Sequence, residues 1–545
     1  MIKKFALACA SACLFVVIPA AVVAQDAKTV LLNAAKAMGA ENLRTIHVSG
    51  TGSHARDIGQ NRGTNTAWPV ERIKAYTRQM DFETGRSYAQ LVRLENGSEE
   101  TLTEYISADS PWSSQYRFWL SPFGFIKGAL ANNATVSSGK IGATPYTVVT
   151  FSVQNKYKVS GYINDKNIVD RVQTWVDNDV LGDMLTEAWF NDYKDFDGLK
   201  YPTMIVEKQA EHPIMILSVA GVRANDTVNI PASAAAAPPN PIAPAASVQS
   251  EKVTDGVYYL KGGTHHSVAV EFSDHAVLIE APLNEQRSLA IIGEMKTLMP
   301  NKPIRYLVNT HHHFDHSGGL RAFVDVGATI ITHESNSRFF ARALSAPRTL
   351  NPDNLARSQK KPVIESVTDT RSLSDGARTL DLHLVRDNPH HDGMLIAFLP
   401  KEKVLIETDV FTPASVVNRD VANLVDNVER LKLDYDVILP LHGTVKPARA
   451  DLYAAIGRPV RDMKDIMAAQ VAAAPGQRGE AALPRGRQIV ERACVGCHFL
   501  GRVERRRDEA QWRDIVARMV EKGAPISGDE TDTILEYLLK NFGPQ

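Results

Sequence analysis

The segment "NTHHHFDHSGG" at Asn309–Gly319 places four histidines and one aspartate within six consecutive positions. Alternate side chains of an extended segment point to the same side, so His311 and His313 can be directed at one point. Asp315 and His316 follow directly and can turn toward a neighbouring point. Imidazole and carboxylate groups are ligands for zinc, iron and manganese. The spacing therefore predicts a metal site.

Further residues of the ligand types lie next to apolar runs downstream. "NPHHDG" precedes the run "MLIAFLP", Asp409 follows "KVLIE", and His442 follows "DVILP". Together with "HAVLIE", "IRYLVN" and "ATIITH" these runs predict buried strands, and "EQRSLAIIGEMKTLM" predicts a helix between two of them. Ligands of α/β proteins gather at strand ends. A lone histidine is usually structural, but a whole set at loop edges favours one shared centre.

"THHHFDHSGG" resembles the HxHxDH signature of the metallo-β-lactamase-fold hydrolases, and the later His, Asp and His follow in that family's order. The resemblance covers about 220 residues and implies an αββα sandwich with two metal sites. His390 is preferred over His391, because the family's third histidine lies three residues before a glycine, here Gly393. By this analogy the first metal is bound by His311, His313 and His390, the second by Asp315, His316 and His442, and Asp409 bridges them.

The resemblance implies a binuclear hydrolase with two divalent ions, most simply zinc. Bound zinc lowers the pKa of water to about 7, and the resulting hydroxide attacks an ester, lactam, lactone or related bond. Asp315 is the expected catalytic residue, which orients the hydroxide and moves its proton. Asp274 matches a supporting aspartate of the family or is a turn residue, and His265 or His266 lines the mouth. Where the family often has glycine before the bridging aspartate, this chain has Thr408.

Two other functions remain open. His311, His390 and Asp409 would also serve a mono-iron redox enzyme similar to the sulfur dioxygenases of the same fold, which would pass electrons to a haem. The di-iron reductases of this fold typically have Glu where this chain has His313, which argues against them. The third hypothesis is an electron-transfer or acyl-binding protein with a relict site.

The second chemical motif is "CVGCH" at Cys494–His498, the CxxCH attachment sequence of haem c. Cys494 and Cys497 would bind the haem vinyl groups, and His498 would be an axial iron ligand. Met519 is the candidate sixth ligand or else a core methionine. A zinc knuckle would need two more ligands, and a redox dithiol would not need the histidine. The segment resembles a small cytochrome c domain, and the covalent haem would complete its small core.

"MIKK" and the apolar run that ends at Ala24 predict a signal peptide and therefore a periplasmic protein; an uncleaved anchor is the alternative. Cleavage would leave Cys494 and Cys497 as the only cysteines. With a net charge of -1, nothing favours nucleic acid as a partner. We expect a small-molecule substrate and a possible periplasmic redox partner, and membrane contact is not required.

Two Ala/Pro-rich segments divide the chain into a multidomain α+β protein: an N-terminal antiparallel β-rich domain, a central αββα metallo-β-lactamase-like sandwich and a small all-α cytochrome c domain. The first domain has no chemical motif and loosely resembles the half-barrels of lipoprotein carriers, which bind acyl chains. The predicted boundaries are 1–24 for the signal peptide, 25–229 for the β-rich domain, 230–247 for a linker, 248–471 for the sandwich, 472–484 for a second linker and 485–545 for the cytochrome domain.

Overall fold

The computed structural model forms two compact units, Met1–Val460 and Arg461–Gln545. The predicted signal peptide and most of both predicted linkers lie outside the described residues. Among the helices that are described, none is long and apolar enough to cross a membrane. The structure describes residues 26–55, 58–64, 66–95, 98–231, 247–412, 418–443, 445–461, 482–494, 507–521, 526 and 530–543.

The N-terminal part is one antiparallel sheet of 11 strands in the order β4-β3-β2-β1-β11-β10-β9-β8-β7-β6-β5. Each strand pairs with its neighbour in sequence except at the centre, where β1 pairs with β11. The strands are β1 (Thr45–Ala55), β2 (Val70–Asp81), β3 (Arg86–Glu95), β4 (Ser98–Ile106), β5 (Thr135–Ile141), β6 (Thr144–Val153), β7 (Tyr157–Ile163), β8 (Val169–Asn178), β9 (Gly182–Phe196), β10 (Leu199–Gln209) and β11 (His212–Ala224). The expectation of a mostly antiparallel domain is confirmed.

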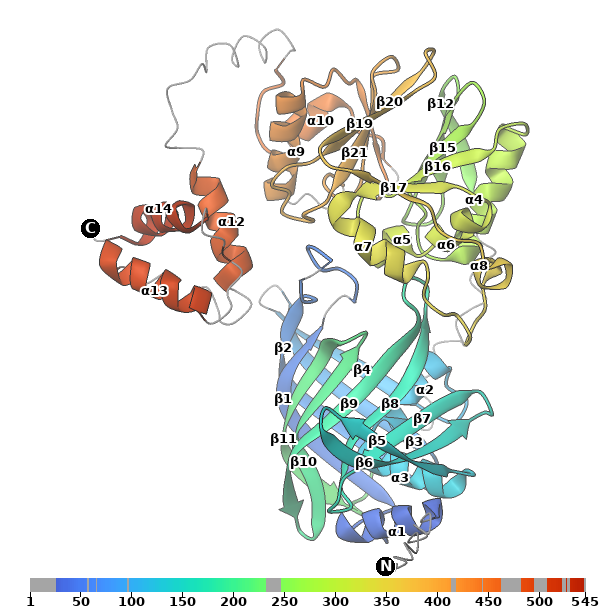
Figure 1. Ribbon diagram of the computed structural model, residues 1–545, viewed down its shortest axis with the longest axis vertical. Coiled ribbons are helices and arrows are strands. Elements are labelled where there is room, and N and C mark those ends of the chain that lie inside the picture. The colour runs from blue at the N-terminus through green and yellow to red at the C-terminus, as the bar shows by residue number, and fades with distance from the viewer. Residues whose placement is uncertain are drawn as a thin grey trace, which may run out of the picture. The chain divides into compact units, whose positions relative to one another are not determined.

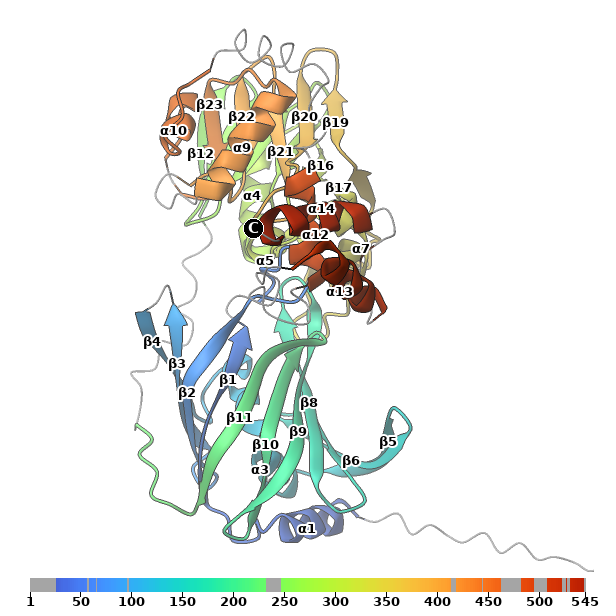
Figure 2. The ribbon, with the colours of Figure 1, turned by 90° about the vertical axis from the view of Figure 1, so that its left-hand side faces the viewer.

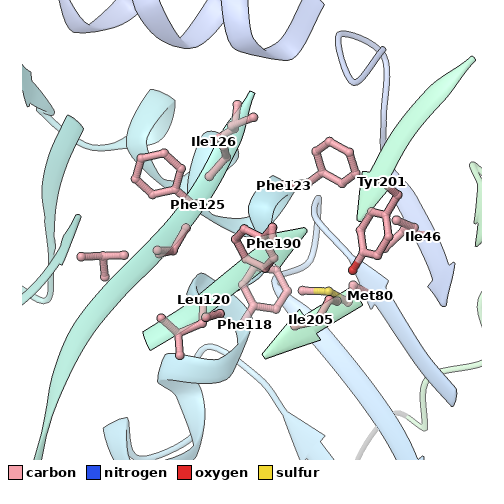
Figure 3. Packing of buried hydrophobic residues seen from close by; sticks show 14 of the residues in the cluster. Ile46, Met80, Phe118, Leu120, Phe123, Phe125, Ile126, Phe190, Tyr201 and Ile205 are labelled. Atoms are coloured by element: carbon pink, nitrogen blue, oxygen red, sulfur yellow. The ribbon is translucent and has the colours of Figure 1, made fainter. Parts of the chain in front are cut away.

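The sheet curves around three helices, α1 (Ala27–Ala37), α2 (Trp112–Trp119) and α3 (Pro122–Ala131), as Figures 1 and 2 show. Aromatic residues of α2 and α3 fill its concave face; Phe118, Phe123 and Phe125 are at most 3% exposed. Figure 3 shows them among aliphatic side chains from several strands. Phe190 on β9 belongs to the same core.

A cavity of about 230 Å³ opens on this sheet, with charged groups along one side. The Glu104 carboxylate accepts a hydrogen bond from Arg78 at 2.6 Å and another from Arg117 at 2.9 Å. Glu207 lies beside them, and Leu91 and Leu102 line the opposite part. A cavity that binds only acyl chains would be apolar throughout, so this one is suited to a ligand that also has a polar group.

The central part is a sandwich of two sheets covered by helices. The larger sheet has the order β12 (Gln249–Thr254), β13 (Val257–Lys261), β14 (Ser267–Glu271), β15 (Ala276–Ile279), β16 (Ile304–Val308), β17 (Thr329–His333), β18 (Ile364–Val367). The smaller sheet has the order β19 (Thr370–Ser374), β20 (Thr379–Leu384), β21 (Leu395–Leu399), β22 (Val404–Glu407), β23 (Val437–Pro440). All six strands expected from apolar runs are present.

Three apolar layers hold the sandwich together. The inner layer lies between the two sheets and contains Val268 and Ile406. One outer layer joins the larger sheet to the helices α4 (Glu285–Leu298), α6 (Leu320–Asp325), α7 (Glu334–Ala343) and α8 (Asn354–Ser358). The other joins the smaller sheet to α9 (Asn418–Leu431) and α10 (Arg449–Ala454). Strands covered on both faces are continuous apolar runs, which explains why they were visible in the sequence.

The unit at the C-terminus contains α12 (Ala482–Cys494), α13 (Glu509–Glu521) and α14 (Thr531–Phe542) among its described residues. Ile489, Trp512 and Leu535 form its apolar core. The helix α12 begins at Ala482, inside the predicted linker 472–484, and the compact unit begins at Arg461 rather than at 485.

A buried ion cluster joins the sandwich to the N-terminal sheet. Asp353, at 3% exposure, caps α8 through the amide of Ala356 at 2.7 Å and binds the guanidinium of Arg321 through both oxygens. Arg348 reaches Asp353 at 3.3 Å and Asp177 at the end of β8 at 2.9 Å. The arginine therefore connects an aspartate of each domain.

We expect Asp353→Ala to lower the free energy of unfolding by about 3–5 kcal/mol, because the buried guanidinium of Arg321 would lose its carboxylate partner, while that of Arg348 would keep Asp177 and Asp179. Burial would raise the pKa of Asp353, but hydrogen bonds from Arg321 and Ala356 lower it. The stabilisation is therefore present at neutral pH and is lost as the pH falls through the folded-state value. Urea unfolding measures the change. Asp369→Ala, which removes a half-exposed ion pair with Arg386, should cost less than about 1 kcal/mol; equal costs would contradict the prediction.

Candidate metal centre

The predicted ligands lie on loops that follow or precede strands of both sheets. His311 and His313 follow β16, and Asp315 and His316 lie in the short helix α5 (Phe314–Ser317). His390 is in the loop between β20 and β21. Asp409 and His442 follow β22 and β23, which are parallel to each other, so their carboxyl ends share one edge. The structure brings all seven residues together in two groups.

The first group consists of His311, His313, His390 and Asp409. One nitrogen or oxygen of each lies within 4.8 Å of the others. The Nε2 atom of His390 is 3.1 Å from Nδ1 of His313 and 3.3 Å from Oδ2 of Asp409. His311 and His313 are at most 1% exposed. This set matches the one implied for the first metal, with the aspartate added.

The second group consists of Asp315, His316, His442 and one further histidine, His265. The Nε2 atoms of His316 and His442 are 3.2 Å apart, and Nε2 of His265 is 3.1 Å from Oδ2 of Asp315. His265 was expected at the mouth of the site and instead lies within the group. His266 points away from it and contacts the carbonyl of Gly443.

Asp409 joins the two groups. Its Oδ2 lies 3.3 Å from Nε2 of His311 and 3.1 Å from Nε2 of His316, and its Oδ1 lies 3.0 Å from Nε2 of His442. Its φ of +62° is in the left-handed region. The Glu407 carboxylate accepts hydrogen bonds from the amides of Val410 and Phe411 and so holds this turn.

The donor atoms fit metal ions. Nε2 of His311 is buried and has no hydrogen-bond partner among the described residues, although it points into the first group. Burial lowers the pKa of His311 well below its ordinary value and that of His313 to about 3. Both imidazoles are therefore neutral, as metal binding requires. Burial would raise the pKa of Asp409, but His316, His311 and His390 hold it well below its ordinary value, so the carboxylate is charged.

The supporting carboxylate is Glu280 and not Asp274. Glu280 follows β15, is fully buried and lies 3.5 Å from Nδ1 of His316. Its other oxygen accepts a hydrogen bond from the backbone amide of Thr310 at 2.6 Å. Asp274 is instead exposed and pairs with Arg305 and His275, which agrees with the alternative that it is a turn residue. An acidic residue directly after a fully buried strand was the signal for Glu280 in the sequence.

The residues predicted to bind haem are only partly described. Cys494 ends α12, and Met519 lies half-buried on α13. Cys497 and His498 lie outside the described residues. The predicted haem site is therefore known here only from its sequence motif.

Residues 260–442 match the family model described as the metallo-beta-lactamase superfamily. Together with the two covered sheets and the His/Asp groups, this match defines a metallo-β-lactamase-fold domain. The chain is also 25% identical, over 207 residues, to the 2,4-dinitroanisole O-demethylase subunit alpha of Nocardioides sp. (strain JS1661). That alignment covers 36% of this chain and 58% of the relative.

Solved structures with some likeness include a metallo-beta-lactamase from Pontibacter korlensis, with 17% identity and a TM-score of 0.30. It is matched over 97% of its own length and 38% of this chain. The metallo-beta-lactamase FIM-1 from Pseudomonas aeruginosa, in a mono-zinc form, has 17% identity and a TM-score of 0.29 over 97% of its length and 42% of this chain.

We expect His390→Ala and His391→Ala to differ in their effect on metal binding. His390 contributes Nε2 to the first group, whereas Nε2 of His391 contacts His312. Loss of an outer partner costs about 10–100-fold in metal affinity, and loss of a direct ligand costs more. Competition with a chromophoric zinc chelator measures both variants. A larger loss for His391→Ala would reverse the assignment.

Proposed function

We propose that the central domain is a hydrolase that holds two divalent metal ions. The observation that carries the proposal is the position of the Asp409 carboxylate, which contacts histidines of both groups. Its Oδ2 lies near histidines of both groups and its Oδ1 near His442 of the second, so the carboxylate is suited to bridge two cations. Burial keeps the pKa values of His311 and His313 low, and these two neutral imidazoles support the same conclusion.

In this proposal the first ion is held by His311, His313, His390 and Asp409. The second is held by His316, His442, Asp315 and Asp409, with His265 beside them. When bound, such ions polarise the bond to be cleaved and lower the pKa of water to about 7.

Asp315 is the catalytic residue in this proposal. Burial would raise its pKa, but hydrogen bonds from His265 and His442 hold the pKa well below its ordinary value. Its carboxylate is therefore charged at neutral pH and can accept a hydrogen bond from water. Because Nε2 of His265 is 3.1 Å from Oδ2, the orientation of the carboxylate is restricted before any substrate binds.

The substrate class extends from esters, lactams and lactones to small aromatic ethers. The last group is included because the relative matched over 207 residues is named for O-demethylation of 2,4-dinitroanisole. A second candidate is the mono-iron redox enzyme. It is favoured by the approach of His311 and His390 to Asp409, at 3.3 Å each, since two histidines and one carboxylate also bind catalytic iron.

Elemental analysis of the haem-loaded protein separates the two functions. We expect two zinc or similar ions per chain in addition to haem iron, and loss of hydrolysis after chelation with recovery on addition of zinc. Asp315→Ala should lower kcat by about 10²–10⁴-fold on a panel of esters, lactams, lactones and nitroaryl ethers. One non-haem iron per chain, with activity that requires oxygen, would contradict the hydrolase and support the redox enzyme.

We further propose that Cys494, Cys497 and His498 bind haem c in the periplasm, where the haem can exchange electrons with a redox partner. The protein produced with a haem-attachment system should retain one haem per chain after denaturation, and Cys494→Ser with Cys497→Ser should retain none. The absorption spectrum of the ferric haem tests Met519. A change to high-spin haem in Met519→Ala would identify Met519 as the sixth ligand, and an unchanged spectrum would identify it as a core residue. Wild-type protein without covalent haem would exclude this proposal.

A further inference from the structure

The loop between β1 and β2 of the N-terminal sheet enters the metal centre of the sandwich domain. Its described residues are 58–64 and 66–69. Asn61 is 3% exposed although it is a polar residue on a loop. It contacts His312 and His313, more than 250 positions later in the chain. The burial of a loop amide among histidines indicates a specific role.

The side-chain amide of Asn61 has only one possible orientation. Its Nδ2 group donates to the carbonyls of Gly63, at 2.7 Å, and Thr66, at 2.9 Å. Because carbonyls only accept hydrogen bonds, Nδ2 must lie on that side, and Oδ1 faces Nε2 of His312 at 2.9 Å. The same side chain therefore shapes the loop and accepts a hydrogen bond from the sandwich domain.

The hydrogen positions on His312 and His391 follow from this orientation. The amide of Gly393 donates to Nδ1 of His391 at 2.9 Å, so neutral His391 carries its hydrogen on Nε2 and donates to Nδ1 of His312. His312 then carries its hydrogen on Nε2 and donates to Asn61. Burial lowers the pKa of His312 to about 3, so it is neutral and both of its nitrogens are satisfied.

The backbone carbonyl of Asn61 acts on the candidate ligand His313. It lies 3.0 Å from Nε2 of His313, so that nitrogen carries the hydrogen and donates to it. Nδ1 keeps its lone pair, and this is the atom that lies 3.1 Å from Nε2 of His390 within the first group. A hydrogen bond on the far nitrogen sets both the tautomer and the orientation of a ligand histidine.

The preceding residue reaches the second group. Nε2 of Gln60 donates to Oδ1 of Asp315 at 2.6 Å, while Oδ2 of that carboxylate faces His265. Adjacent residues of one loop therefore support one candidate ligand in each group.

The loop is fastened to the sandwich domain on both sides of these contacts. Arg62 pairs with Asp392 at 2.9 Å, and its carbonyl accepts the amide of Asp392 at 2.8 Å. The Thr64 hydroxyl donates to the carbonyl of Ser335 at 3.1 Å. Gly59 has a φ of +85°, and a Cβ there would lie 2.3 Å from the Phe314 ring, so only glycine fits.

We propose that Asn61 and Gln60 are positioning residues of the metal centre. The N-terminal sheet then supplies residues that orient the candidate ligands. The inference rests on the proposed metal sites. In this arrangement, Asn61 holds His313 so that Nδ1 is free for the first ion, and Gln60 orients Asp315 toward the second ion.

The test uses the full chain and zinc or cobalt alone as the probe. Asn61→Ala keeps the backbone carbonyl that faces His313 but removes the side-chain hydrogen bonds to Gly63, Thr66 and His312 that hold this carbonyl in place. It should therefore weaken, by about 10–100-fold, binding of the ion whose site contains His390. Gln60→Ala should weaken, by a similar factor, binding of the second ion, which His442→Ala should abolish. Competition titration gives the two affinities, and the cobalt absorption spectrum reports the coordination of each. Thr64→Ala, in the same loop, removes the hydrogen bond to the Ser335 carbonyl and should leave both affinities within about twofold of wild type.

The two proposals fail in different ways. Wild-type protein that binds no metal at these residues overturns the proposed function. Wild-type binding at both sites in Asn61→Ala and Gln60→Ala, with unchanged cobalt spectra, overturns the positioning role alone. An equal loss at both sites in Asn61→Ala, Gln60→Ala and Thr64→Ala also overturns it, since the loop would then act only as a structural clamp. If Asn61→Ala does not fold, as thermal melting reveals, the selective effect of Gln60→Ala decides the outcome.

Discussion

The structure of the sandwich domain depends on one carboxylate that several imidazoles approach within 3.0–3.3 Å. Asp409 holds this place between the histidines of the two groups. Burying a negative charge among histidines is unfavourable unless positive charge balances it. Protons on the histidines can supply that charge, and metal ions supply it without requiring protonated rings. The left-handed backbone at Asp409 and the buried Glu407 that caps its turn are local costs of holding the carboxylate there.

Around this charge, three of the candidate ligands have a partner on their outer side. Glu280 faces His316, the Asn61 carbonyl faces His313, and Gln60 faces Asp315. Such partners matter because a histidine can present only one nitrogen to a metal, and the hydrogen on the other nitrogen decides which one it is. The partners come from both domains of the first unit. The N-terminal sheet thus contributes to the site through the loop between β1 and β2, and Ile58 of the same loop also lines the cavity of that sheet.

The two metal chemistries proposed for this chain make different demands on the protein. A haem attached through CxxCH needs a short segment with three residues in fixed order, so a small helical unit is enough. The His/Asp centre needs ligands from five loops and therefore a large, rigid sandwich. The requirement for a scaffold differs because the haem brings its own four nitrogen ligands, while the second centre must obtain all its ligands from side chains.

The buried strands, the candidate ligand residues and the CxxCH motif could all be read from the amino-acid sequence. Strands covered on both faces are continuous apolar runs, and "THHHFDHSGG" and "CVGCH" contain chemically specific residues at characteristic spacing. Only the tertiary structure decided that His265 joins the second group, that Glu280 and not Asp274 supports His316, and that Asn61 and Gln60 enter the site. The physical reason is that these residues act through hydrogen bonds across distant parts of the chain. Neither periodicity nor local spacing records such contacts, since they exist only after the two domains have folded and packed together.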